Sequence, residues 1–173
     1  MCEIRKTINA NDPSLHPLKI IILTLGKTSA SYLREGIAIY QDRLKHYAKV
    51  EYKELPDVPA KGISSEVLKE REGEVLMKQI KSDDFVLLLD ENGDHFSSRG
   101  FAEMLQRRMN SGVKQLVLII GGAFGFSTAM YARANGKISF SKMTFSHEMI
   151  RLLLVEQLYR AHTILKGESY HHD

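Results

Sequence analysis

The sequence predicts an α/β protein with a mostly parallel sheet, helices on both faces of that sheet, and a single domain. Three observations lead to this prediction. Short apolar runs alternate along the chain with longer segments in which apolar residues recur every three or four positions, a pattern typical of alternating strands and helices. The strand runs are apolar at consecutive positions, which indicates that both faces of the sheet are covered. The chain has 173 residues, the size of one domain with its own core.

The first strand is expected over residues 18–25, where the β-branched isoleucines at 20–22 favour a buried strand and Gly26 ends it. A helix over 31–46 follows, because apolar residues recur there at three- and four-residue steps. These residues are Leu33, Ile37, Tyr40, Leu44 and Tyr47. The second strand is expected over 50–55.

Residues 56–65 contain Pro59 and Gly62 and are expected to form a loop. The second helix is marked by Leu68, Val75, Leu76 and Ile80, although Gly73 lies inside it. The third strand is expected over 85–89, closed by a turn at Asn92 and Gly93.

The third helix is expected to begin at a cap formed by Ser97 or Ser98 and to end at Gly112. The fourth strand, 116–120, leads directly into a glycine-rich turn. The remaining expected elements are a short helix over 127–134, a brief strand over 138–140 and a long helix over 146–165.

Residues 1–17 lack a hydrophobic period and hold two of the four prolines, so a flexible leader is expected before a folded domain at 18–173. The charged N-terminus does not resemble a secretory signal, and no apolar stretch approaches the roughly 20 residues that span a bilayer. The single cysteine, Cys2, cannot form an internal disulfide. These features favour a cytoplasmic protein with no membrane partner. The net charge of +3 is small, so any nucleic-acid contact must come from local patches.

A glycine-rich segment, GGAFG, follows a strand and precedes a helix. Gly121, Gly122 and Gly125 would let backbone amides approach a ligand closely, but glycines serve a simple turn equally well, and both interpretations stay open. The spacing is not that of the dinucleotide fingerprint GxGxxG. Lys27 follows Gly26 as in a P-loop, but that motif needs an earlier glycine where this chain has Ile21.

The last helix is apolar on more than one face, from Met149 to Tyr159. One face is expected to pack on the sheet and the other on a second copy of the chain, because a wide apolar patch would otherwise remain exposed. Glu156 and Arg160 are spaced for an ion pair within the helix. The tail after this helix either is frayed or supplies a histidine as proton acceptor, with a tyrosine or arginine to stack on or hydrogen-bond an extruded base.

Three C-terminal stretches, IIGGAFGF, ISFSKMTFSHEMIRLLLVEQLYRA and GESYHHD, resemble the bacterial ribosomal RNA large subunit methyltransferase H family, a member of the SPOUT class. The resemblance begins at Leu18 with KIIILTLGK, passes through VLLLDENG and reaches the end of the chain. Members of this family commonly have a proline before the histidine that opens the last helix. This chain has Ser146 there, which can cap the helix, so no loss of fold or activity is expected.

The resemblance implies a C-terminal trefoil knot, a homodimer formed through the last helix, and methylation of N3 of a pseudouridine in 23S ribosomal RNA, within the ribosome. It implies S-adenosyl-L-methionine as cofactor, S-adenosyl-L-homocysteine as product, and no metal. The predicted cofactor site comprises Leu89, Gly121, Gly122, Gly125, Phe140, Ser141, Lys142, Met143, Thr144 and Phe145. The predicted catalytic and RNA-binding residues are His147, Arg160, Tyr170 and His171.

Methyl transfer from a sulfonium is an in-line displacement, in which the protein chiefly positions the two reactants and manages one proton. His171, or a water that it positions, is the expected proton acceptor. The main alternative is a noncatalytic RNA-binding protein that retains the fold. A nucleotide-binding protein of flavodoxin type is disfavoured because neither phosphate-binding pattern is present.

Overall fold

The computed structural model describes residues 18–172. The predicted leader at 1–17 lies outside the described residues, as does Asp173. A five-stranded sheet has the order β2-β1-β4-β3-β5, and every neighbouring pair is parallel. The strands are β1 (Lys19–Leu25), β2 (Val50–Leu55), β3 (Phe85–His95), β4 (Gln115–Ile120) and β5 (Gly136–Ser139). The predicted α/β class with a parallel sheet is confirmed.

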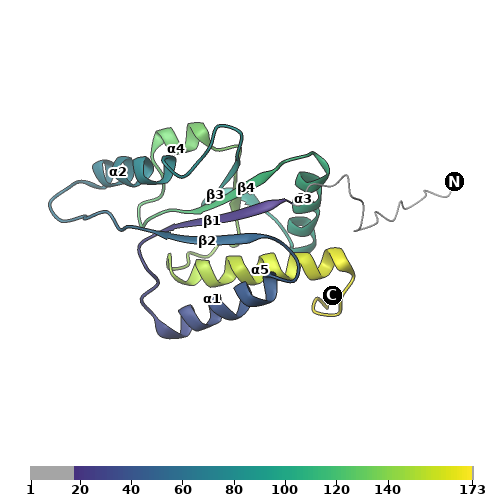
Figure 1. Ribbon diagram of the computed structural model, residues 1–173. Coiled ribbons are helices and arrows are strands. Elements are labelled where there is room, and N and C mark those ends of the chain that lie inside the picture. Colours follow the sequence, from purple (N-terminus) through teal and green to yellow (C-terminus); the bar gives the residue numbers. More distant parts are fainter. Residues whose placement is uncertain (1–17, 173) are drawn as a thin grey trace.

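Within residues 18–172, five helices connect and cover these strands: α1 (Ser31–Leu44), α2 (Ser65–Met77), α3 (Ser98–Asn110), α4 (Thr128–Arg133) and α5 (Met149–Lys166). Figure 1 shows α2 and α4 on one face of the sheet and α1 and α5 on the other. Helix α3 joins α1 and α5 on their face, because all three contribute to the same buried cluster. The sheet is therefore covered on both faces, as the apolar strands predict.

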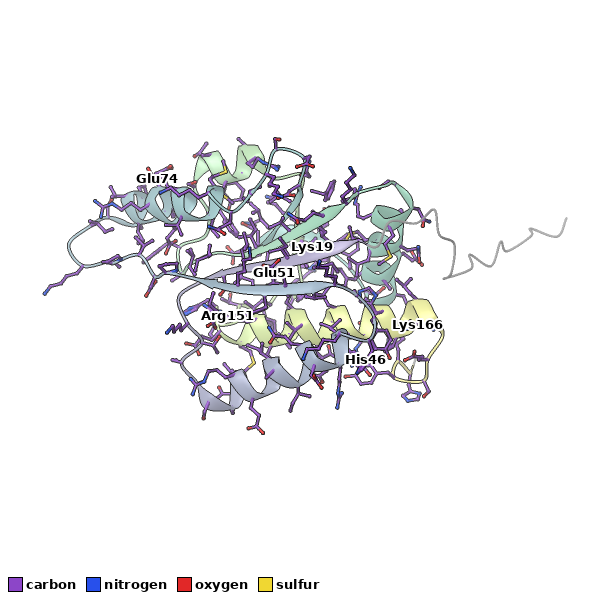
Figure 2. All side chains as sticks on the ribbon, in the orientation of Figure 1. Lys19, His46, Glu51, Glu74, Arg151 and Lys166 are labelled. Carbon is purple, nitrogen blue, oxygen red and sulfur yellow. The ribbon has the colours of Figure 1, made fainter. Side chains whose placement is uncertain are left out.

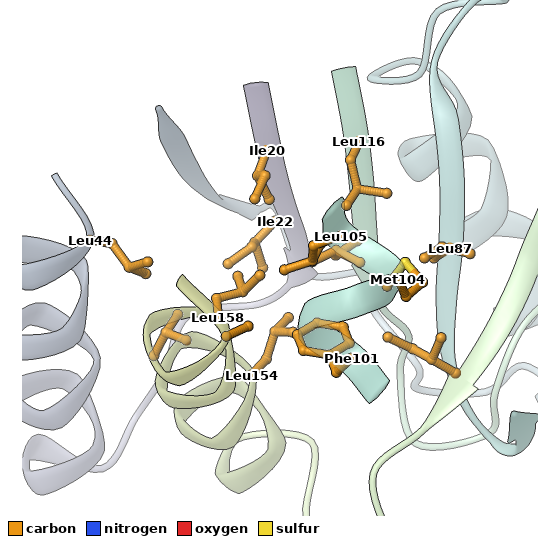
Figure 3. Packing of buried hydrophobic residues seen from close by; sticks show 14 of the residues in the cluster. Ile20, Ile22, Leu44, Leu87, Phe101, Met104, Leu105, Leu116, Leu154 and Leu158 are labelled. Atoms are coloured by element: carbon orange, nitrogen blue, oxygen red, sulfur yellow. The ribbon is translucent and has the colours of Figure 1, made fainter. Parts of the chain in front are cut away.

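Alternate residues of each strand serve different cores. On β1, Ile20 and Ile22 pack with α1, α3 and α5, whereas Ile21 and Leu23 pack toward α2 and α4. Figure 3 shows the larger core, in which Leu154 and Leu158 of α5 meet Phe101 and Leu105 of α3 below the strands. This alternation explains why the strands are apolar at consecutive positions.

Helix α5 is flanked by α1 and α3 as well as by the sheet. A Cβ added at Gly36 of α1 would lie 3.0 Å from the nearest methyl of Leu152, so the two helices approach closely. The neighbouring helices thus cover much of the second apolar face of α5, for which a second copy was expected. A second copy is therefore not needed to cover the apolar residues of α5. The homodimer stays a prediction that rests on the resemblance.

The predicted turn at Asn92 and Gly93 is wrong, because β3 continues through both residues to His95. Strand β5 pairs with β3 in two stretches, with a register shift between Leu89 and Asp94. A Cβ at Gly93 would lie 2.6 Å from the backbone nitrogen of Ile138, so the glycine permits a close approach of two backbones. The Asn-Gly pair therefore marks an irregularity within the strand.

Other boundaries differ by a few residues from the prediction. Ser97 caps α3, since its hydroxyl accepts from the Gly100 amide at 3.1 Å. Helix α5 begins at Met149, three residues after the predicted start, although the Ser146 hydroxyl accepts from the Met149 amide at 3.2 Å as a cap would. Within residues 18–172, no helix is both long and apolar enough to cross a membrane. The trefoil knot stays a prediction.

Candidate functional site

A pocket of about 530 Å³ lies at the carboxyl ends of β4 and β5, beside the middle of β3. Its walls are residues 89–92 of β3, residues 120–126 after β4 with Tyr131 of α4, and residues 138–141 and 143–147 with Ile150. Parallel α/β sheets bind ligands at this edge, and the volume suits a small organic molecule.

The structure brings together at this pocket every residue predicted to bind the cofactor except one. Those that line it are Leu89, Gly121, Gly122, Gly125, Phe140, Ser141, Met143, Thr144 and Phe145. Lys142 is exposed to solvent and does not line the pocket. Their role in cofactor binding stays a prediction.

The glycine segment is both a tight turn and a wall of the pocket. The Gly125 amide donates to the Gly122 carbonyl at 3.2 Å, and Gly125 has a φ of +82°, which favours glycine. A Cβ at Gly121 would lie 3.0 Å from the ring of Phe126. The segment can therefore be a simple turn and also place its backbone amides at a ligand, so the two interpretations from the sequence are compatible.

The loop 140–145 forms the opposite wall. The Ser139 hydroxyl donates to the Ser141 carbonyl at 2.9 Å, and the Ser141 hydroxyl accepts from the Met143 amide at 2.8 Å. Phe140 packs edge-on against Phe101, with 5.7 Å between ring centroids. Phe145, by contrast, is exposed. Local hydrogen bonds thus hold the loop, Phe140 packs inward, and the side chains of Met143 and Phe145 stay exposed.

Apolar side chains form the rim of the pocket. Among the described residues, the large hydrophobic side chains exposed to solvent include Phe124, Tyr131, Met143 and Phe145, and all four line this pocket. Met143 is 76% exposed. Exposed apolar groups gathered around one concavity are typical of a binding site.

Two polar residues of the pocket, Asp90 and Tyr131, were missed by the sequence analysis. The Tyr131 hydroxyl donates to Oδ2 of Asp90 at 2.6 Å and so joins α4 to the middle of β3. Burial, and then the hydrogen bond to Asp90, raises the pKa of Tyr131 to about 12. Asp90 directly follows the apolar run of β3, where side chains at a carboxyl edge reach a ligand, and this position was the available signal.

A buried guanidinium fixes the segment that leads into α5. Arg151, 1% exposed, donates to the carbonyls of Leu25 at 2.6 Å and Gly26 at 3.0 Å, and to the Thr28 hydroxyl at 3.0 Å. Its Nε donates to the His147 carbonyl at 3.1 Å. Figure 2 labels Arg151 near the start of α5. This one side chain therefore ties the loop after β1 to the pocket residue His147.

Glu148 makes a second tie to the same loop. Its carboxylate accepts from the Ser29 hydroxyl at 2.6 Å and from the amides of Ser29 and Ala30 at 3.0 and 3.2 Å. The hydrogen bond from the Ser29 hydroxyl, followed by those from the two amides, lowers the pKa of Glu148 to about 2. The wall of the pocket at 143–147 is thus anchored from behind.

The predicted catalytic residues divide between two places. His147 lines the pocket and is exposed, whereas Arg160, Tyr170 and His171 do not line it. Arg160 lies about 15 Å further along the axis of α5 than Ile150, at the usual rise per residue. Figure 2 marks that end of the helix by Lys166.

Arg160 and Tyr170 form a cluster of their own around Glu156. Oε1 of Glu156 accepts from Nε of Arg160 at 3.0 Å and from the Tyr170 hydroxyl at 3.1 Å, and the guanidinium lies 4.7 Å from the Tyr170 ring centroid. The expected ion pair within the helix is confirmed. Tyr170 also packs edge-on against Tyr159, with 4.8 Å between centroids, so this part of the tail is docked.

The parallel sheet and the pocket at its carboxyl edge define an α/β protein with a candidate site for a small ligand. Comparison with known proteins identifies the family: one described as "Predicted SPOUT methyltransferase" matches residues 18–171. The chain belongs to the SPOUT methyltransferase family.

Three relatives named ribosomal RNA large subunit methyltransferase H are similar to this chain over nearly their whole length. The protein of Christiangramia forsetii is 51% identical over 90% of this chain and 99% of its own length. That of Cytophaga hutchinsonii is 50% identical over 90% of this chain and 100% of its own. That of Parabacteroides distasonis is 46% identical over the same shares, 90% and 100%.

Proposed function

We propose that this protein transfers a methyl group from S-adenosyl-L-methionine to N3 of a pseudouridine in 23S ribosomal RNA and releases S-adenosyl-L-homocysteine. The family and the names of the relatives support methylation of large-subunit RNA. The observation that carries the proposal is the convergence of Leu89, the glycine loop and the loop 140–145 on one pocket with an apolar rim. We further propose that residues 18–173 act in the cytoplasm, on the ribosome.

The residues present fit the methyl donor. The loop 121–125 contributes backbone groups at glycines that carry no side chain of their own, and Asp90 places a carboxylate at the pocket for polar groups of a ligand. Phe124 and Phe145 supply apolar surface for a purine ring. The methyl donor supplies an activated methyl on its sulfonium. The described residues contain no group of three or more acidic, histidine or cysteine side chains arranged to hold a metal.

The acceptor side requires a second copy of the chain in this proposal. Arg160, Tyr170 and His171 lie far along α5 from the pocket of their own chain, so they reach a pocket only if two chains pair through α5. Arg160 and Tyr170 then orient the target base, while His147 stands at the pocket itself. Base N3 must lose its proton, and His171 or a water that it positions takes it.

Mass spectrometry of ribosomal RNA from a strain that lacks the gene tests the reaction. We expect the loss of one methyl group from the large-subunit RNA, restored by the intact gene. An unchanged set of methylated nucleotides would refute the assigned reaction. Calorimetric titration of the purified protein with S-adenosylmethionine separates the main alternative, since absence of binding at millimolar concentration favours a noncatalytic RNA-binding protein.

A further inference from the structure

A buried carboxyl group lies directly behind the glycine loop. Glu72 of α2 is 6% exposed, and the structure gives its side chain no hydrogen bond or ion pair within residues 18–172. A Cβ added at Gly122 would lie 2.8 Å from the carboxyl carbon of Glu72. The carboxyl group therefore packs against the backbone of Gly122, and a side chain at that position would displace it.

This environment favours the uncharged form of the acid. Burial without a compensating donor raises the pKa of Glu72 above its usual value of 4.5, and the negative charge of Asp57 raises it further. Asp57 comes from the segment after β2 and lies against Gly26. The glycine loop and the start of α4 present Gly122 and Ser127 to this region, and neither of these ionises.

We propose that Glu72 is a positioning residue for the methyl donor: its uncharged carboxyl supports Gly122 from behind and keeps the loop 121–125 in the shape that lines the pocket. An ionised carboxylate is not stable in this unpartnered place, because burying its charge costs several kilocalories per mole. Loss of the proton thus moves the side chain toward water and removes the support of the loop. The inference rests on the proposed binding of S-adenosylmethionine.

Calorimetric affinities for S-adenosylhomocysteine, measured from about pH 5 to about pH 9, test this inference. In the wild-type protein, the affinity is expected to be highest at low pH and to fall about tenfold as pH rises through the pKa of Glu72. Glu72→Gln is uncharged at every pH and should retain the low-pH affinity throughout. The amino group of the ligand titrates equally in all variants, so the difference between profiles belongs to Glu72.

Asp57→Asn gives a second test that leaves the buried residue intact. It removes the negative charge that raises the pKa of Glu72, so the loss of affinity should begin at a lower pH than in wild type. Circular dichroism at each pH shows that the proteins compared are folded. Parallel profiles for wild type and Glu72→Gln would overturn the inference while the proposed function stands. A folded wild-type protein without affinity at any pH would instead refute the binding on which both rest.

Discussion

Replacement of Arg151 tests whether one buried side chain holds the wall of the pocket. Arg151→Met keeps most of the volume but removes the donors to the carbonyls of Leu25, Gly26 and His147 and to the Thr28 hydroxyl. The guanidinium also lies 3.6 Å from Oε1 of Glu54, and breaking a buried ion pair by removing one partner costs about 3 to 5 kcal/mol. We expect the free energy of unfolding to fall by about 4 kcal/mol, a large part of the stability of an ordinary domain.

Urea denaturation followed by circular dichroism measures this change. Arg151→Lys keeps the charge but has fewer donors without the planar fork, so it should lose about 2 kcal/mol. Lys45→Met is the matched control, because Lys45 is 71% exposed in its pair with Asp42 and should change stability by less than about 0.5 kcal/mol. If Arg151→Met loses no more than this control, the guanidinium does not hold the segment as argued.

Three further changes probe the site. Tyr131→Phe removes the hydrogen bond to Asp90 and should weaken binding of S-adenosylhomocysteine about fivefold, measured by calorimetry; unaltered affinity would contradict a role for this contact in shaping the pocket. The pKa of Glu148 is lowered from 4.5 to about 2, so the stability that it adds is present above pH 4.5 and is lost as pH falls through that interval. Glu148→Gln should therefore be less stable than wild type at neutral pH in urea denaturation and should lose less on acidification; equal pH profiles would show that the Ser29 contacts do not stabilise the fold. His171→Ala should slow methylation of ribosomal subunits and leave cofactor affinity nearly intact, and an unchanged rate would remove His171 from the mechanism.

Sequence periodicity predicted the order and kind of the elements, because burial on both faces of a parallel sheet leaves continuous apolar runs such as that of β1. It failed at Gly93, where a glycine typical of turns instead allows β5 to approach β3. The need for a glycine at position 93 comes from the backbone of Ile138, a residue distant in sequence. A local pattern could not reveal a contact made only when the chain is folded.

The residues of the pocket also divide into those that the sequence predicted and those that only the folded structure reveals. The resemblance identified Leu89 and the two loops, because their residue types lie in an ordered series of motifs along the chain. Asp90, Tyr131 and Arg151 were missed, because their roles come from hydrogen bonds across elements. Glu72 carries no local signal at all, since a glutamate in a helix is ordinarily exposed.

Several polar side chains hold the segments at the carboxyl edge of the apolar sheet in place. Arg151 and Thr28 fix the segment before α5, Ser139 bonds to the loop that follows β5, and Ser127 caps α4 beside the glycine turn. Arg151 and Ser139 donate to backbone carbonyls, Ser127 accepts from an amide in the first turn of α4, and the Thr28 hydroxyl joins Arg151 to Glu54. Glu72 differs from them because it gains no such bond where it lies. A buried polar group kept without a partner lowers stability, so the place of Glu72 behind Gly122, in a wall of the pocket, is the reason for assigning it a role in binding rather than in folding.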